Sequence, residues 1–146
     1  MKIPQTLAEL ISLVESNNNP HAVRYEQWMR PTRTVIENCK KFNGGAICTD
    51  QTAQELCKFS YGLYQIMGIG IYELNYKHSI FDFVNNTDDQ LDVFINFISS
   101  RRIDYSLFDV LHNQSHRENF AFHYNGDRLT YSKRLIDVYK SVGGVI

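Results

Sequence analysis

Apolar residues recur at intervals of three and four positions along most of the chain, the spacing that gathers them on one face of an α-helix. Four such residues define the first predicted helix: Leu7, Leu10, Ile11 and Val14. Thr6 and Glu9 have the spacing of a capping box at its start. Three asparagines and Pro20 end the helix, so that Glu15 lies in its last turn, at the edge of the apolar face.

Prolines and glycines divide the next stretch into short pieces. Pro20, Pro31 and the Asn-Gly-Gly turn at residues 43–45 separate them. We expect a small β-hairpin near residues 20–31 and a short helix over about residues 32–42.

Helical patterns fill the rest of the chain. One begins at Thr49 or Asp50, and we expect it to kink near residues 60–62 and to resume until Gly68. Five more helices are expected in the C-terminal half, and they are marked by Ser79, by Thr87 with Gln90, by Leu107, by Ser115 with Glu118, and by the stretch 130–140.

The expected fold class is therefore mainly α, with one domain over residues 1–146. A chain of 146 residues that is 43% hydrophobic can bury a core without the help of a metal or a disulfide. Nothing repeats internally and no segment is of low complexity, so the sequence gives no sign of a second domain.

Charge, cysteines and the N-terminal stretch narrow the function classes. The formal net charge of −1 provides no field that attracts nucleic acid or anionic membranes. Cys39, Cys48 and Cys57 lack zinc spacing, and their odd number leaves at least one unpaired, while a Cys39–Cys48 bridge stays open. Pro4 and two acids interrupt the opening apolar stretch, and no segment approaches the ~20 apolar residues that span a bilayer. We expect synthesis in the (host) cytoplasm without a signal peptide, no stable membrane insertion, no nucleic-acid partner, and no metal or other cofactor.

Glu15 is the first candidate for chemistry. The C-terminal end of a helix carries partial negative charge, and an apolar neighbourhood disfavours a charged carboxylate. Both effects raise the pKa of a carboxyl group, as a proton donor that works near neutral pH requires. By position alone, an ordinary glutamate at a helix end is the more frequent case.

Two further stretches combine glycine, aromatic and amide side chains. Residues 60–68 read Ser-Tyr-Gly-Leu-Tyr-Gln-Ile-Met-Gly, in which the glycines allow close approach of backbone or ligand. Gln65 offers a donor and an acceptor that suit sugar hydroxyls and N-acetyl groups. Residues 120–126 read Phe-Ala-Phe-His-Tyr-Asn-Gly. Gly126 can adopt the left-handed backbone conformation that often ends an α-helix. Each stretch is also compatible with packing alone.

Taken in order, these stretches resemble the lysozyme-like superfamily of goose-type lysozymes and soluble lytic transglycosylases. The Val-Glu-Ser at 14–16, with the Asn-Pro-x-Ala that follows, is similar to the segment that carries the catalytic acid of that family. Residues 62–67 are similar to its Gly-Leu-x-Gln-Ile-Met motif, and residues 124–126 to its Tyr-Asn-Gly element. The chain most resembles the phage N-acetylmuramidase (endolysin) catalytic domain. Asp127 departs from the pattern, because a proline or a second glycine often follows the Tyr-Asn-Gly element.

The resemblance implies cleavage of the β-1,4 bond between N-acetylmuramic acid and N-acetylglucosamine in bacterial peptidoglycan. Glu15 would be the general acid, and Glu26, eleven residues later on the expected hairpin, would be the second catalytic carboxylate. The substrate-binding residues would be Ser16, Ser60, Tyr61, Gly62, Gln65, Tyr124 and Asn125. We expect a monomer that binds glycan strands, and that is delivered to the periplasmic peptidoglycan by another factor or carried in a virion.

Three alternatives stay open. If no second acid reaches the cleft, the N-acetyl group of the substrate would complete the reaction, as in a lytic transglycosylase that forms a 1,6-anhydro product. The domain could instead bind peptidoglycan without cutting it, as a virion or wall-associated module. It could also be an unrelated helical interaction domain. Convergence of Glu15, Gln65 and Tyr124 on one groove separates this last alternative from the others.

Overall fold

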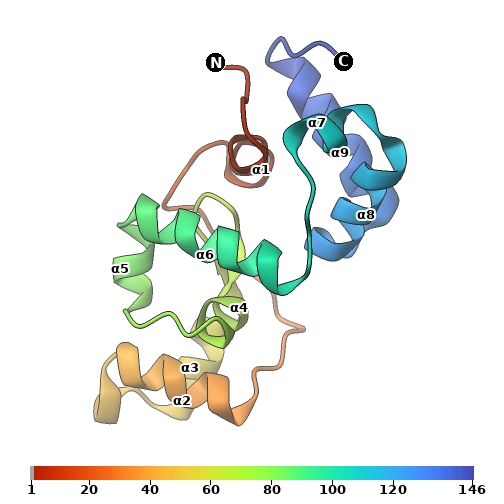
Figure 1. Ribbon diagram of the computed structural model, residues 1–146. Coiled ribbons are helices and arrows are strands. Elements are labelled where there is room, and N and C mark those ends of the chain that lie inside the picture. Colours follow the sequence, from red (N-terminus) through yellow and green to blue (C-terminus); the bar gives the residue numbers. More distant parts are fainter. Residues whose placement is uncertain (1) are drawn as a thin grey trace.

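Helices make up most of the computed structural model, which describes residues 2–146 (Figure 1). Nine α-helices lie within these residues: α1 (Leu7–Ser16), α2 (Arg33–Phe42), α3 (Asp50–Cys57), α4 (Gly68–Glu73), α5 (Ile80–Val84), α6 (Thr87–Ser100), α7 (Leu107–His112), α8 (Gln114–Asn125) and α9 (Arg128–Ser141). A short 3-10 helix, η1, spans Gly45–Ile47. The mainly α fold class expected from the sequence is confirmed.

Polar N-cap residues set where most helices begin, and two of the expected caps are wrong. Asn86 caps α6 by accepting from the Asp89 N–H at 3.0 Å, so Thr87 already lies inside that helix. Asn113 caps α8 in the same way, one residue before the helix starts and two before Ser115. An asparagine side chain caps at least as well as a hydroxyl, so the neighbouring asparagine took the position in both cases.

The caps of the first and last helices also differ in detail from the expectation. Thr6 accepts from the Glu9 N–H at 3.1 Å, but the Glu9 carboxylate accepts from Gln5, so only half of the expected capping box forms. Asp127 accepts from the Thr130 N–H at 2.9 Å, and α9 therefore begins two residues before the expected start at Thr130. The residue that departs from the family pattern thus serves as a helix cap.

A three-stranded antiparallel sheet stands beside the helices. Its strands are β1 (Val23–Tyr25), β2 (Phe59–Tyr61) and β3 (Ile66–Met67), in the order β1-β2-β3. The expected hairpin within residues 20–31 is wrong, because β1 pairs with β2, in the register Val23↔Tyr61 and Tyr25↔Phe59. The sequence around a strand of three residues does not indicate which distant strand will pair with it.

The expected kinked helix is wrong beyond Cys57. The chain forms β2, a tight turn and β3, and α4 then begins at Gly68, where the helix was expected to end. Gly62 (φ +81°) and Gln65 (φ +50°) adopt the left-handed region, which a right-handed helix excludes. The spacing of Leu63 and Ile66 imitates a helical pattern, but Leu63 lies in the hairpin turn and Ile66 begins β3.

Gln90 of α6 holds the β2–β3 turn in place with its side-chain amide. The residue is fully buried, and its Oε1 accepts from the Leu63 N–H at 2.8 Å. Its Nε2 donates to the Pro20 and Phe83 carbonyls at 3.1 and 2.9 Å. Gln90 was expected as part of a helix cap, but it joins α6 to the segment before β1 and to the β2–β3 turn.

The hydrophobic core joins two groups of helices. Figure 1 shows α7, α8 and α9 gathered near α1 at one end and α2 to α5 at the other, with α6 across the middle. Fully buried residues come from both groups, among them Leu10 of α1 and Leu135 of α9 in the first group and Ile71 of α4 and Phe83 of α5 in the second. The end of α1 lies between α9 and the β2–β3 turn, because Arg134 of α9 contacts the Val14 carbonyl and the Ser16 hydroxyl contacts the Leu63 carbonyl.

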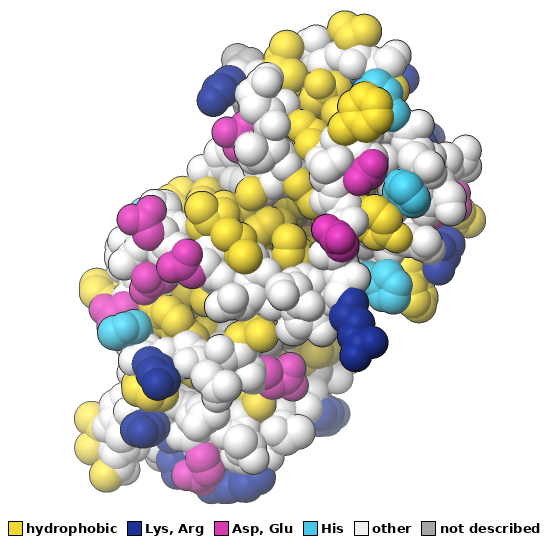
Figure 2. All heavy atoms as spheres, viewed as in Figure 1, with side chains coloured by type: hydrophobic (Ala, Val, Ile, Leu, Met, Phe, Trp, Pro, Cys, Tyr) yellow, Lys and Arg dark blue, Asp and Glu magenta, His cyan; other side chains and the backbone are white. Residues whose placement is uncertain are grey.

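Three features of the core and the surface complete the description of the fold. The three cysteines are buried and free, so the Cys39–Cys48 bridge that the sequence left open is not formed. Figure 2 shows apolar side chains gathered in the middle of one face, where a groove between α1 and α6 is lined by Leu7, Ile95 and Tyr105 among others. Across residues 2–146, the helices are too short or too polar to cross a membrane.

Candidate active site

Glu15 is a buried carboxyl group at the end of α1. Its side chain is only 5% exposed. Burial raises the pKa of Glu15, and the nearby Glu26 adds to this effect, while Arg24, the Tyr131 hydroxyl and Arg134 oppose it. The net shift is upward, as expected from the sequence for a proton donor.

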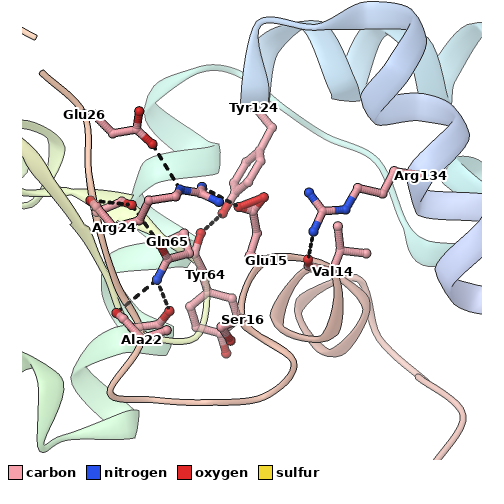
Figure 3. A network of polar contacts seen from close by, with 12 residues as sticks. Val14, Glu15, Ser16, Ala22, Arg24, Glu26, Tyr64, Gln65, Tyr124 and Arg134 are labelled. Carbon is pink, nitrogen blue, oxygen red and sulfur yellow. Dashed lines mark hydrogen bonds and ion pairs between the residues drawn. The ribbon is translucent and has the colours of Figure 1, made fainter. Parts of the chain in front are cut away.

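Arg24 links Glu15 to a second carboxylate. Glu26 directly follows β1, two positions after Arg24, which places both side chains on the same face of the extended chain. The Nε of Arg24 donates to Glu26 Oε1 at 3.1 Å, and its Nη2 lies 3.9 Å from Glu15 Oε2 (Figure 3). The two candidate catalytic carboxylates are thus held around one guanidinium group.

Two hollows meet at this group. The α9 hollow, of about 840 Å³, lies between the end of α1, β1 and α9, and Arg134 and Val138 line it. The α8 hollow, of about 490 Å³, lies between the sheet, α4 and the ends of α6 and α8. Glu15, Arg24 and Gln65 line both hollows. Both volumes fall in the range of about 300–1,000 Å³ that is usual for ligand sites.

Gln65 and Ser60 form a hydrogen-bond network below the carboxylates. Gln65 Oε1 accepts from the Ser60 hydroxyl at 2.8 Å, and Gln65 Nε2 donates to the Ala22 and Gly62 carbonyls, both at 3.0 Å (Figure 3). Both ends of the Gln65 amide are therefore engaged within the protein. Gln65 fixes the β2–β3 turn to the segment before β1, although it also lines both hollows.

Ser16 fastens the end of α1 to the same turn. Its hydroxyl lies 2.8 Å from the Leu63 carbonyl and 3.0 Å from the Ser12 carbonyl, and it accepts from the Asn19 N–H at 3.2 Å. Because Ser16 directly follows Glu15, this contact fixes the position of the buried acid relative to the sheet.

Tyr124 and Asn125 reach the site from the end of α8. The Tyr124 hydroxyl donates to the Tyr64 carbonyl at 2.7 Å, and its ring stacks on Phe120 with the centroids 5.4 Å apart. Burial, followed by the negative charge of Glu15, raises the pKa of Tyr124 well above its usual range. Asn125 is exposed and lines the α8 hollow.

Seven of the nine site residues expected from the sequence line one of the two hollows, and two do not. Tyr61 is 4% exposed, and its hydroxyl donates to the Leu56 carbonyl at 2.6 Å inside the core. Gly62 forms the turn, and its N–H donates to the Ala22 carbonyl at 2.8 Å. The structure places both residues behind the site rather than on its surface.

A set of residues around Glu15 was not predicted from the sequence. Arg134 of α9 donates from Nη2 to the Val14 carbonyl at 2.8 Å, which satisfies a free carbonyl near the end of α1. The buried Tyr131 hydroxyl lies beside Glu15, close enough to lower the Glu15 pKa, and has no hydrogen bond of ordinary length to a described residue. Tyr131 and Arg134 are three positions apart and share one face of α9, the only signal that the sequence offered.

Within residues 2–146, no group of three or more His, Cys, Asp or Glu side chains is arranged to hold a metal ion. The groups that the chain itself brings to the site are the carboxyl, guanidinium and phenol groups described above.

Comparison with known proteins gives two matches. The profile of the N-acetylmuramidase family matches residues 5–143. The endolysin of Enterobacteria phage PRD1 is 31% identical over 132 residues, which cover 83% of this chain and 86% of that protein. No solved structure matches the chain.

Proposed function

The chain belongs to the N-acetylmuramidase family, and we propose that it cleaves the β-1,4 bond between N-acetylmuramic acid and N-acetylglucosamine with Glu15 as the general acid. The proposal rests on one observation. A carboxyl group with 5% exposure and a raised pKa lies where two ligand-sized hollows meet. Few structural roles need a buried acid at such a position.

Glu15 would deliver its proton to the glycosidic oxygen. Burial keeps part of the Glu15 population protonated at a pH at which an exposed glutamate is ionised. As the bond to the leaving sugar breaks, the oxygen gains negative charge and takes the proton, while positive charge develops on the ring of the other sugar. The raised pKa serves this step because a general acid works best when its pKa lies near the working pH, where it still holds the proton that it transfers.

Glu26 would be the second carboxylate. It lines the α8 hollow together with Glu15 and is held by the 3.1 Å contact with Arg24. A carboxylate in this place can position a water molecule or stabilise the developing positive charge. The presence of Glu26 on the same hollow favours hydrolysis over the formation of a 1,6-anhydro sugar.

The remaining residues would hold the substrate or the acid. Tyr124 and Asn125 line the α8 hollow at the end of α8, and we propose that they contact the glycan strand there. Ser16, Ser60 and Gln65 make hydrogen bonds within the protein, and we propose that they position Glu15 and the β2–β3 turn. Gly62 serves the turn itself, and Tyr61 supports it from the core.

The test is an isosteric substitution of the acid. Glu15→Gln keeps the shape of the side chain but removes the transferable proton, and we expect lysis of permeabilised Gram-negative cells to fall by about 10²–10⁴-fold or more. Glu9→Gln is the matched control, because Glu9 lies on the same helix, is half-exposed and lines neither hollow. Circular dichroism should show the same helix content for both variants. Lysis by Glu15→Gln at a rate near that of the wild type would contradict the assignment.

Product analysis separates the two reaction types. Mass spectrometry of digested peptidoglycan shows a reducing sugar end after hydrolysis, whereas a 1,6-anhydro end is lighter by one water. We expect the hydrolytic product, and we expect Glu26→Gln to lower its rate of formation. An anhydro product would assign the chain to the lytic transglycosylases, and binding to peptidoglycan without any cleavage would make it a non-catalytic module.

A further inference from the structure

Two exposed aromatic rings face the α8 hollow, and the proposed reaction does not use them. Trp28, in the segment between β1 and α2, is 68% exposed. Phe122 of α8 is 48% exposed and lines the same hollow. Large aromatic side chains that stay exposed in a concave site commonly mark a binding surface.

The two rings come from separate walls. Trp28 follows Glu26, whose N–H donates to the Lys58 carbonyl at 2.7 Å and fixes the end of β1 against the residue before β2. Phe122 is held by Arg128, whose guanidinium lies 4.8 Å from the ring centroid. The hollow between the rings also has Glu15 in its lining.

The composition of the hollow fits a carbohydrate better than an apolar ligand. A sugar ring presents C–H groups on its faces and polar groups around its edge. Aromatic rings can bind the faces, and the indole N–H remains available to a polar partner. Arg101, Glu73 and Asn125 line the same hollow and can meet the polar edge.

We propose that Trp28 and Phe122 form a sugar-binding subsite for a β-1,4-linked N-acetylhexosamine unit of the strand that reaches Glu15. This subsite rests on the proposed function, because its occupant is a neighbouring unit of the same strand. It sets the affinity for the glycan, while Glu15 carries out the proton transfer.

The first experiment uses Trp28 itself as the reporter. It is the single tryptophan of the chain, so selective excitation reports on this position alone. The Glu15→Gln variant, which prevents turnover, is titrated with chitohexaose, and we expect a saturable blue shift of the emission. Phe122→Ala in the same background should weaken the apparent affinity by about tenfold, the size of effect seen when a well-placed aromatic contact is removed.

The second experiment measures rates in the active enzyme. Trp28→Ala should raise the peptidoglycan concentration that gives half-maximal lysis by about tenfold and change the maximal rate little, and Trp28→Tyr should restore most of the loss. The control is Phe108→Ala, because Phe108 is 69% exposed, close to the 68% of Trp28, but lies on α7 and lines neither hollow. Phe108→Ala should behave like the wild type.

The results that overturn the subsite differ from those that overturn the proposed function. The subsite is rejected if the Trp28 emission stays unchanged while calorimetry shows that chitohexaose binds. It is also rejected if calorimetry detects no binding of chitohexaose. The subsite is also rejected if Trp28→Ala lyses cells with the wild-type concentration dependence. Loss of the proposed function requires that the wild-type protein fails to cleave peptidoglycan or that Glu15→Gln stays active.

Discussion

The Nη2 atom of Arg24 lies 3.9 Å from Glu15 Oε2, so the buried acid faces a half-exposed cation at the junction of the two hollows. This cation and the burial of the acid act on the Glu15 pKa in opposite directions. Burial raises the pKa of Glu15 and Arg24 lowers it, and the position of the net shift sets the pH range in which the acid is protonated.

Arg24→Gln should move the pH dependence of lysis. Without the cation, the pKa of Glu15 rises further. A larger fraction of Glu15 then holds its proton at each pH in the titration range. We therefore expect the alkaline limb of the kcat/KM profile to shift to higher pH, whatever happens to the height of the profile. The measurement is the rate of lysis across the acidic, neutral and mildly alkaline range. Arg30→Gln, a change at an exposed arginine that lines neither hollow, should leave the limb in place.

Glu15→Gln should make the folded state more stable at neutral pH. The pKa of Glu15 is higher in the folded chain than in the unfolded chain, so folding is penalised once the unfolded chain loses this proton. The contribution of protonated Glu15 is complete below the unfolded pKa near 4.5 and is lost as the pH rises through the folded value. Each pKa unit of difference corresponds to about 1.4 kcal/mol. Melting temperatures of the two proteins should therefore coincide below the unfolded pKa and diverge at mildly alkaline pH, and a variant that is less stable under both conditions would show that the burial argument is wrong.

Gly62→Ala should destabilise the fold far more than Gly45→Ala. Both glycines have positive φ, at +81° and +59°, so both substitutions carry a similar backbone cost of about 1–2 kcal/mol. At Gly62 the new Cβ would also lie 2.5 Å from Gln90 Oε1, and that amide is held by hydrogen bonds to three other groups, whereas nothing lies within 4 Å at Gly45. We expect an additional loss of about 1–3 kcal/mol at position 62, measured by urea unfolding. Equal losses at the two positions would mean that Gln90 moves freely.

The helices and the position of Glu15 could be predicted from the sequence, because the patterns that indicate them lie within a few neighbouring residues. Val14 and its apolar neighbours on α1, followed by the asparagines, placed Glu15 in the last turn of a helix, and the structure keeps it there. The sheet was not accessible, because each strand has two or three residues and β1 finds its partner 36 positions away. The spacing of Leu63 and Ile66 therefore suggested that the helix beginning near residue 50 continued to Gly68.

The surroundings of Glu15 were partly hidden for the same reason. Gln65 was expected to bind substrate from its chemistry, and only the fold shows that Ser60, Ala22 and Gly62 already use its amide. Arg134 contacts Val14, which is 120 positions away in the sequence. Local patterns in a single sequence cannot predict a contact between residues that far apart. Motif order could predict which residues gather, but not which hydrogen bonds they make with each other.

Tyr131→Phe tests whether the least satisfied group of the site has a role in positioning the acid. The Tyr131 hydroxyl is buried beside Glu15 and lacks a hydrogen-bond partner of ordinary length within residues 2–146, so its removal breaks no hydrogen bond of ordinary length. We expect the free energy of unfolding to stay equal or to rise slightly, because a buried hydroxyl without a partner carries a desolvation cost of about 1–3 kcal/mol. The hydroxyl also lowers the pKa of Glu15, so its loss should raise that pKa and move the alkaline limb of the kcat/KM profile upward, in the direction expected for Arg24→Gln. A purely structural tyrosine would change stability and leave the limb unmoved, and Tyr139→Phe, a change on the same helix that leaves both hollows intact, gives the baseline.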